Sequence, residues 1–196
     1  MGRPREHDPQ TVRTEVMRCF WRLGFDGASM AELEAAAGID RRQLARDYGN
    51  KRGLFLQAID DYHEAAAAKI FGRMERTDAG LAEIEATLSA LNSLSGELGC
   101  LLCNTSTEPI AQQDRDVHKR VRAFFSRIEA AYSNALSNAS ERGEIALRPA
   151  QLQQAARHLL SAHIGLTVLA RSRTPMEVRS DAVQGALQTL HSEVPC

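Results

Sequence analysis

Three arginines and a glutamine stand close together between Asp40 and Gly49, and their chemistry suits DNA. Arginine presents two hydrogen-bond donors to a base edge and glutamine presents a donor and an acceptor, and arginine also pairs with phosphates. The four residues are Arg41, Arg42, Gln43 and Arg46. Leu44 and Tyr48 lie four residues apart, on one side of any helix formed here. The spacing therefore predicts a helix that is buried through Leu44 and Tyr48 and leaves the cationic side chains in solvent.

A second short helix precedes this one, and a glycine turn joins the two. Ser29 can cap a helix over residues 30–37, whose apolar positions recur at helical spacing. Gly38 can take the left-handed conformation that ends it, and Asp40 can cap the next helix. This arrangement is typical of a helix-turn-helix, whose second helix enters the major groove of DNA.

Cys100 and Cys103 form a C-x-x-C pattern with chemistry of its own. At the start of a helix the Cys100 thiol could have a lowered pKa and react with oxidants or electrophiles, or the pair could close a disulfide. The alternative is core packing, since cysteine is often buried and no cationic residue stands beside the pair. Cys19 is expected in the core, and Cys196 has no predictable role.

Polar and aromatic residues further along are candidates to line an apolar cavity among the C-terminal helices. They are Asn104, Phe125, Tyr132, His163 and Thr167. No metal site is expected, because His158 and His163 are five residues apart and no second C-x-x-C or paired histidine motif occurs. Phosphate-cradling loops, nucleophile elbows and metalloprotease motifs are also missing, so we expect neither an enzyme nor a cofactor.

Helical periodicity runs through nearly the whole chain, and no segment alternates in the manner of a strand. We therefore expect an all-α fold. Predicted helices cover approximately residues 9–23, 30–37, 41–48, 51–73, 80–94, 114–141, 149–172 and 175–192, with a short helix between 99 and 110. Phe20 and Trp21 are predicted to be core residues, because aromatic residues at helical spacing usually pack.

Composition limits the class of protein. The chain has 196 residues, 43% of them hydrophobic, which permits a substantial core, and its net charge of −1 argues against a protein that coats nucleic acid non-specifically. Its apolar runs are shorter than a membrane span, and MGRPREHDPQ lacks the hydrophobic region of a signal peptide. We expect a cytoplasmic protein with reduced thiols.

The first 62 residues resemble the DNA-binding region of the TetR-like family of bacterial transcriptional regulators, through GRPRE, LGFDGASMAELEAAAGID and YGNKRGLF. The resemblance implies an N-terminal three-helix helix-turn-helix domain over residues 1–62. It further implies a larger helical domain over residues 63–196 that binds an effector and dimerises. The implied function is a ligand-responsive transcriptional regulator, and specifically a repressor that leaves its operator when a small-molecule effector binds.

The resemblance also assigns roles to individual residues. It makes Arg41, Arg42 and Gln43 base or phosphate contacts, and it makes Ser29 and Lys51 phosphate contacts. The chain departs from the family at Ala45, where an aromatic residue is common, and at Asp47, where a neutral or basic residue is common. Asp47 could pair with Arg46 or Lys51, or it could accept a hydrogen bond from a cytosine amino group. The segment GCLLCNT is more loosely similar to a branch that contains electrophile- and quinone-responsive repressors.

A single recognition helix reads few base pairs, so we expect a homodimer on a near-palindromic double-stranded operator. The apolar helices 149–172 and 175–192 are predicted to form its interface, with Ala156 and Ala186 permitting close approach; alternatively, these are core residues of one subunit. Arg3 and Arg5 form either a disordered tail or a minor-groove contact. The alternative function is a helical ligand-binding or thiol-redox protein without specific DNA binding.

Overall fold

The computed structural model describes residues 8–94 and 98–191, and all regular structure in these ranges is helical, so the prediction of an all-α fold is confirmed. Arg3, Arg5 and Cys196 lie outside the described residues. The helical elements are α1 (Pro9–Gly27), α2 (Met30–Ala37), α3 (Arg41–Tyr48), α4 (Lys51–Ala66), the π-helical turn η1 (Ala67–Phe71), α5 (Gly72–Met74), α6 (Leu81–Asn92), α7 (Leu101–Thr105), α8 (Ile110–Gln113), α9 (Arg115–Glu141), α10 (Pro149–Arg171) and α11 (Met176–His191).

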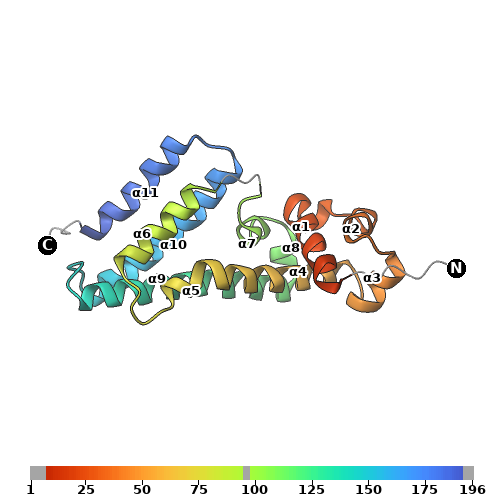
Figure 1. Cartoon of the computed structure of the whole chain (residues 1–196), viewed down its shortest axis with the longest axis horizontal. Helices are drawn as coiled ribbons and strands as arrows, with labels where there is room; N and C mark the ends of the chain where they lie inside the picture. Colours follow the sequence, from red (N-terminus) through yellow and green to blue (C-terminus); the bar gives the residue numbers. More distant parts are fainter. Residues whose placement is uncertain (1–7, 95–97, 192–196) are drawn as a thin grey trace.

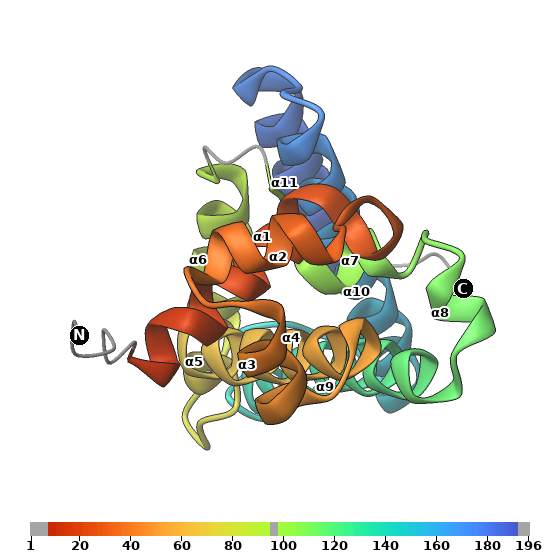
Figure 2. The ribbon, with the colours of Figure 1, turned by 90° about the vertical axis from the view of Figure 1, so that its right-hand side faces the viewer.

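The molecule is elongated, with α2 and α3 at one end and α11 towards the other (Figure 1). Helices α4 and α9 run lengthwise and connect the two ends, while α6, α10 and α11 form a layer above α9. Viewed from the α3 end, α2 and α3 stand in front of the remaining helices (Figure 2). The short helices at this end are therefore free to meet a large partner.

Local caps and an aromatic cluster build the first unit. The Asp8 carboxylate accepts hydrogen bonds from the first turn of α1, where Pro9 needs no donor partner. The rings of Phe20 and Phe25 lie 4.9 and 5.0 Å from that of Phe55, which fixes α1 against α4. The predicted end of the first helix at Leu23 coincides with an interruption at Gly24, after which one more turn continues to Gly27.

The fourth predicted helix is regular only as far as Ala66. A π turn over Ala67–Phe71 then leads into α5. A π turn inserts an extra residue between hydrogen-bonded partners, and hydrophobic periodicity does not reveal it.

Helices α9 and α10 supply much of the larger core, and α10 also packs against α6, α7 and α11. These contacts bury Ala156 and Ala186 at 0% and 4% exposure within one chain. The prediction that these two alanines face a partner subunit is therefore wrong, because neighbouring helices of the same chain cover that side. Large apolar side chains at this end that do face solvent are Val168, Met176 and Val178.

Within the described part of the chain, no helix combines the length and hydropathy needed to cross a bilayer.

Candidate functional site

Helices α2 and α3 meet at the turn expected from their caps. Ser29 and Glu32 form a reciprocal capping box, with the Ser29 hydroxyl oxygen accepting from the Glu32 amide at 3.2 Å. Gly38 has a φ of +69° and ends α2, and the Asp40 carboxylate accepts from the Gln43 amide at 2.9 Å to begin α3. Since the Ser29 oxygen serves as the acceptor, its hydroxyl proton stays available for another acceptor, such as a phosphate.

Helix α3 has one buried side and one cationic side. Leu44 is fully buried and Tyr48 half-buried, while Arg41, Arg42 and Arg46 are exposed and Gln43 is half-exposed. Arg41 lies at ion-pair distance, 4.0 Å, from Glu34 of α2. No hydrogen bond or ion pair within the described residues engages the Arg42 guanidinium, which is therefore free to meet a base edge.

Arg46 is engaged by its neighbour. Its Nε donates to Asp47 Oδ1 at 2.9 Å, and the Asp47 hydrogen bond raises the pKa of Arg46 above its ordinary value. Asp47 is therefore the partner of Arg46 in the absence of DNA. Ala45 and Asp47, the two departures from the family pattern, are both exposed.

The junction of α3 and α4 is tightly packed. The Asn50 side chain accepts from the Gly53 amide at 2.9 Å, and a Cβ atom on Gly53 would stand only 2.1 Å from the Tyr48 carbonyl oxygen. Lys51 opens α4, with Nζ 3.4 Å from the Asp26 carbonyl oxygen and 4.6 Å from the centre of the Phe25 ring. The ammonium group is therefore held against the end of α1.

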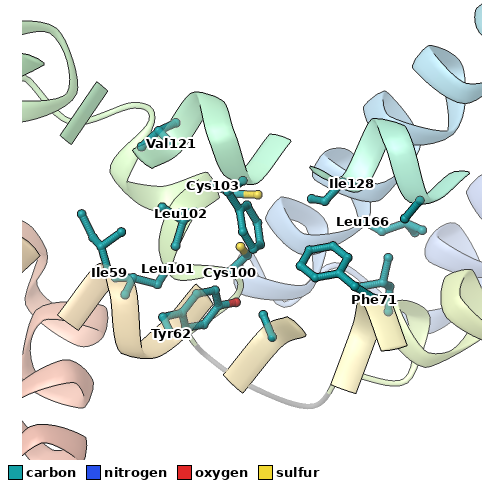
Figure 3. Close-up of a cluster of buried hydrophobic side chains, with 14 of the residues drawn as sticks. Ile59, Tyr62, Phe71, Cys100, Leu101, Leu102, Cys103, Val121, Ile128 and Leu166 are labelled. Atoms are coloured by element: carbon teal, nitrogen blue, oxygen red, sulfur yellow. The ribbon is translucent and has the colours of Figure 1, made fainter. Parts of the chain in front are cut away.

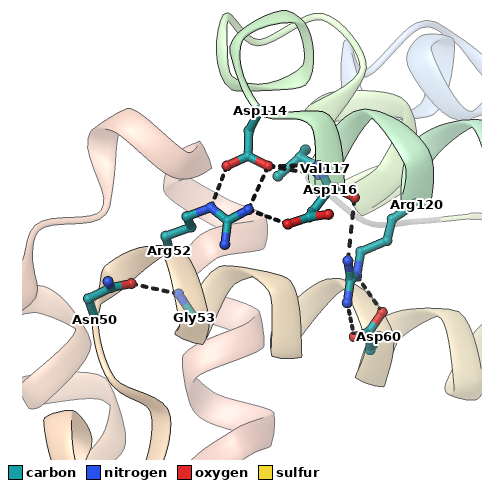
Figure 4. A network of polar contacts seen from close by, with 8 residues as sticks. All are labelled: Asn50, Arg52, Gly53, Asp60, Asp114, Asp116, Val117 and Arg120. Atoms are coloured by element: carbon teal, nitrogen blue, oxygen red, sulfur yellow. Dashed lines mark hydrogen bonds and ion pairs between the residues drawn. The ribbon is translucent and has the colours of Figure 1, made fainter.

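Ion pairs join α4 to the start of α9 (Figure 4). Arg52 donates to Asp114 and Asp116, and Arg120 donates to both oxygens of Asp60 at 2.8 and 2.9 Å. The Arg52 hydrogen bond lowers the pKa of the Asp114 carboxyl to about 2. Because Asp114 also caps α9, these ion pairs connect the start of that helix to α4.

A cavity of about 520 Å³ lies between the helix-turn-helix and the larger helical core. Its described lining comes from α1, from the α4–α5 segment, from α6, from the chain just before α7 and from α10. Of the residues predicted to sense a ligand, Cys100, His163 and Thr167 line it. Asn104, Phe125, Tyr132 and Cys103 are not among its lining residues: Asn104 donates to the Leu98 carbonyl at 2.7 Å, Phe125 is half-buried, and Tyr132 and Cys103 are buried.

Sequence reasoning missed the part of the wall that comes from α1. Trp21 is only half-buried and lines the cavity, with its indole Nε1 donating to the Leu98 carbonyl at 2.9 Å. Met17 and Tyr62 stand in the same wall. Periodicity predicts that such residues face inward, but it does not tell a core from a cavity.

The two cysteines and Tyr62 face one another at the cavity, which Cys100 and Tyr62 line (Figure 3). Both thiols are buried and free, at 4% and 3% exposure. Hydrogen bonds from the Cys103 thiol and the Tyr62 hydroxyl lower the pKa of the Cys100 thiol, against the opposing effect of burial, while the pKa of Cys103 is raised. The Cys100 thiolate is therefore favoured by neighbouring hydrogen-bond donors. The dipole of α7 contributes little, because this helix has only five residues.

His163 is a neutral group at the floor of the cavity. Its Nδ1 lies 3.2 Å from the Tyr132 hydroxyl, and burial lowers its pKa to about 4. No group of three or more metal-ligating side chains occurs within residues 8–94 and 98–191.

Comparison with known proteins identifies the type of molecule. Residues 16–58, from the middle of α1 into α4, match the model described as "Bacterial regulatory proteins, tetR family". A regulator from Bacillus subtilis, YezE, which is described as an uncharacterized HTH-type transcriptional regulator, is 27% identical over 97% of this chain and 100% of its own length. Its DNA-binding region is of the TetR type. The resemblance noted from GRPRE and the motifs that follow it is therefore confirmed.

A further relative and two solved structures agree over most of the chain. The transcriptional repressor ComR of Escherichia coli is 27% identical over 74% of this chain and 70% of its own. Among solved structures, a cysteine mutant of the regulator CifR, complexed with 26 bp double-strand operator DNA, superposes with a TM-score of 0.82 at 23% identity, covering 95% of this chain and 98% of that one. The reduced form of E. coli NemR has a TM-score of 0.78 at 19% identity, with 93% and 100% covered. These structures share the fold of the TetR-like regulator described here.

Proposed function

We propose that this TetR-family regulator represses transcription by binding a near-palindromic operator as a homodimer, and that a small molecule in the cavity releases it. The observation that carries the proposal is that α1 serves two sites. It packs on α2 and α4 within the helix-turn-helix, and it also supplies Trp21 and Met17 to the cavity wall. A ligand there touches the DNA-binding unit directly, so occupancy can shift its orientation.

In the proposed complex, α3 enters the major groove. Arg42 reads a base edge, Arg41 and Gln43 contact bases or phosphates, and Ser29 and Lys51 hold phosphates on either side. Arg46 exchanges Asp47 for a phosphate. The exposed cationic side of α3 and its position at the end of the molecule support these roles.

Dimerisation would use the outward sides of α10 and α11. Val168 and Val178 are each 50% exposed, and the Cα atoms of Gly165 and Gly185 face open space. Such a surface permits close approach of two helix pairs around a two-fold axis. In this proposal, residues 1–62 bind DNA and also contribute Trp21 and Tyr62 to the cavity wall, while residues 63–196 form the rest of the ligand site and pair the subunits.

The test compares two single variants on two duplexes: the DNA upstream of this protein's own gene and a scrambled version of it. We expect Arg42→Ala to weaken binding to the upstream duplex by about 1–3 kcal/mol with little effect on the scrambled one, whereas Lys51→Ala weakens both alike. Arg122→Ala, which removes an exposed cation from the middle of α9, is the matched control. Wild-type protein that binds both duplexes equally would overturn the proposal.

A second candidate is that the ligand signal is chemical rather than a reversible contact. Cys100 lines the cavity with a lowered thiol pKa, and Cys103 stands beside it. An electrophile that enters the cavity could therefore be attacked by the Cys100 thiolate, and the adduct would occupy the space next to Trp21.

A further inference from the structure

The described walls of the cavity differ in charge between floor and rim. The floor is apolar or neutral, because Trp21, Tyr62 and Cys100 lie there with a His163 imidazole whose pKa of about 4 leaves it uncharged near neutral pH. The three charged residues in the described lining are all cations, namely Arg18, Lys69 and Arg73. No Asp or Glu from the described part of the chain lines the cavity.

Two of these cations lack an internal partner. Arg18 pairs with Glu15 at 2.8 Å, but no ion pair or hydrogen bond engages the side chain of Lys69 or Arg73 among the described residues. Both are exposed. Two arginines nearer to α9 are instead paired with carboxylates, Arg127 with Glu75 and Arg120 with Asp60. Two cations that no carboxylate of the described residues neutralises therefore stand beside an apolar hollow.

The π turn lies in this wall. Ala66 immediately before it, Lys69 within it and Arg73 after it all line the cavity. Such turns cost regular hydrogen bonding and recur at functional sites. Here the end of α4, the π turn and α5 all contribute residues to the cavity lining. The two unpaired cations, Lys69 and Arg73, are among these residues and lie four positions apart in the chain.

From these observations we infer that the effector is an organic anion with an apolar body. The inference rests on the proposed function, whose effector site it specifies. The apolar body packs against Trp21, Tyr62 and the α6 side of the cavity, and the acidic group pairs with Lys69 and Arg73 at the rim. A volume of about 520 Å³ suits a small molecule with a chain or ring system of this kind.

Three probes of equal chain length separate charge from hydrophobicity: decanoate, decan-1-ol and decyltrimethylammonium, each below its micelle concentration. Trp21 is the single tryptophan of the chain, so its fluorescence reports binding without a label. We expect decanoate to bind at least tenfold more tightly than the cation and more tightly than the alcohol. Equal or reversed preference, or no binding of any probe, overturns the inference.

Variants then locate the anion. Lys69→Ala/Arg73→Ala should reduce decanoate affinity about tenfold and leave decanol affinity unchanged, and Lys69→Glu/Arg73→Glu should reverse the preference in favour of the cation. Arg122→Ala, an exposed cation outside the cavity, is the control and should change neither. An anion preference that persists in the charge-reversed variant overturns the assignment.

Operator binding is measured separately, so the two proposals can fail independently. Anion binding without operator release would leave the site assignment intact and refute the regulatory role. If operator binding responds to other molecules and the fluorescence titration shows no anion preference, the regulatory role stands and the anion assignment is refuted.

Discussion

Replacing Gly53 by alanine should distort the recognition helix. An added Cβ would stand 2.1 Å from the Tyr48 carbonyl oxygen, whereas such contacts essentially never fall below 3.0 Å. The end of α3 must therefore move by roughly 0.9 Å relative to α4, the difference of these two distances. Overpacking of this kind costs about 1–3 kcal/mol, and the better helix propensity of alanine offsets about 1 kcal/mol of it.

Two assays test this expectation. Chemical denaturation should show a net loss of up to about 2 kcal/mol for Gly53→Ala, the difference of the two opposing effects. Fluorescence anisotropy should show about tenfold weaker operator binding, because a displacement near 1 Å is large compared with the tolerance of hydrogen bonds to bases. Gly72→Ala is the matched control: its Cβ would make an ordinary 3.7 Å contact, so it should be neutral or slightly stabilising. If Gly53→Ala is as stable as the control and binds operator normally, the steric argument is refuted.

Three further outcomes are expected. Burial raises the pKa of Glu108, whose carboxylate accepts a hydrogen bond from the Phe25 amide, so ionisation of Glu108 lowers the stability of the fold as the pH rises from 4.5, its ordinary pKa, through the raised value. Glu108→Gln should therefore be more stable than wild type at pH 7 but not at pH 4. A stability difference that does not change with pH would contradict this. Gly165→Arg places a long cation on the outward side of α10 and should shift the mass in light scattering from two chains to one of 21.6 kDa; an intact dimer would exclude that interface. If sensing is covalent, a quinone should release DNA from wild type and Cys19→Ala but not from Cys100→Ser, and normal release from Cys100→Ser would return both cysteines of the C-x-x-C pattern to the core.

Local signals in the sequence were sufficient for the helix-turn-helix. Ser29, Gly38 and Asp40 each act on hydrogen bonds within three or four residues, so their roles as caps follow from residue type and spacing. Leu44 faces inward for the same reason: the period of a helix determines which side is apolar.

The cavity could not be predicted in the same way, because its wall joins residues distant in the chain. Trp21 of α1 and His163 of α10 line the same cavity, yet each lies on an apolar side of its helix that would also fit an ordinary core. Ala156 shows the converse problem, since an apolar side of α10 fits a partner subunit as well as it fits α9 or α11. Only the packing of the whole chain decides between these alternatives.

The ion pairs between α4 and α9 alter the meaning of an ionic-strength experiment on this protein. The slope of operator affinity against salt concentration is ordinarily converted to a number of neutralised phosphates. Arg52 and Arg120 form carboxylate pairs that are themselves partly open to water, with Arg52 44% and Asp60 45% exposed, so added ions also weaken the connection between the two ends of the molecule. Part of the measured slope then comes from inside the protein, and a phosphate count taken from it has to be compared with that of a variant in which these internal pairs are removed.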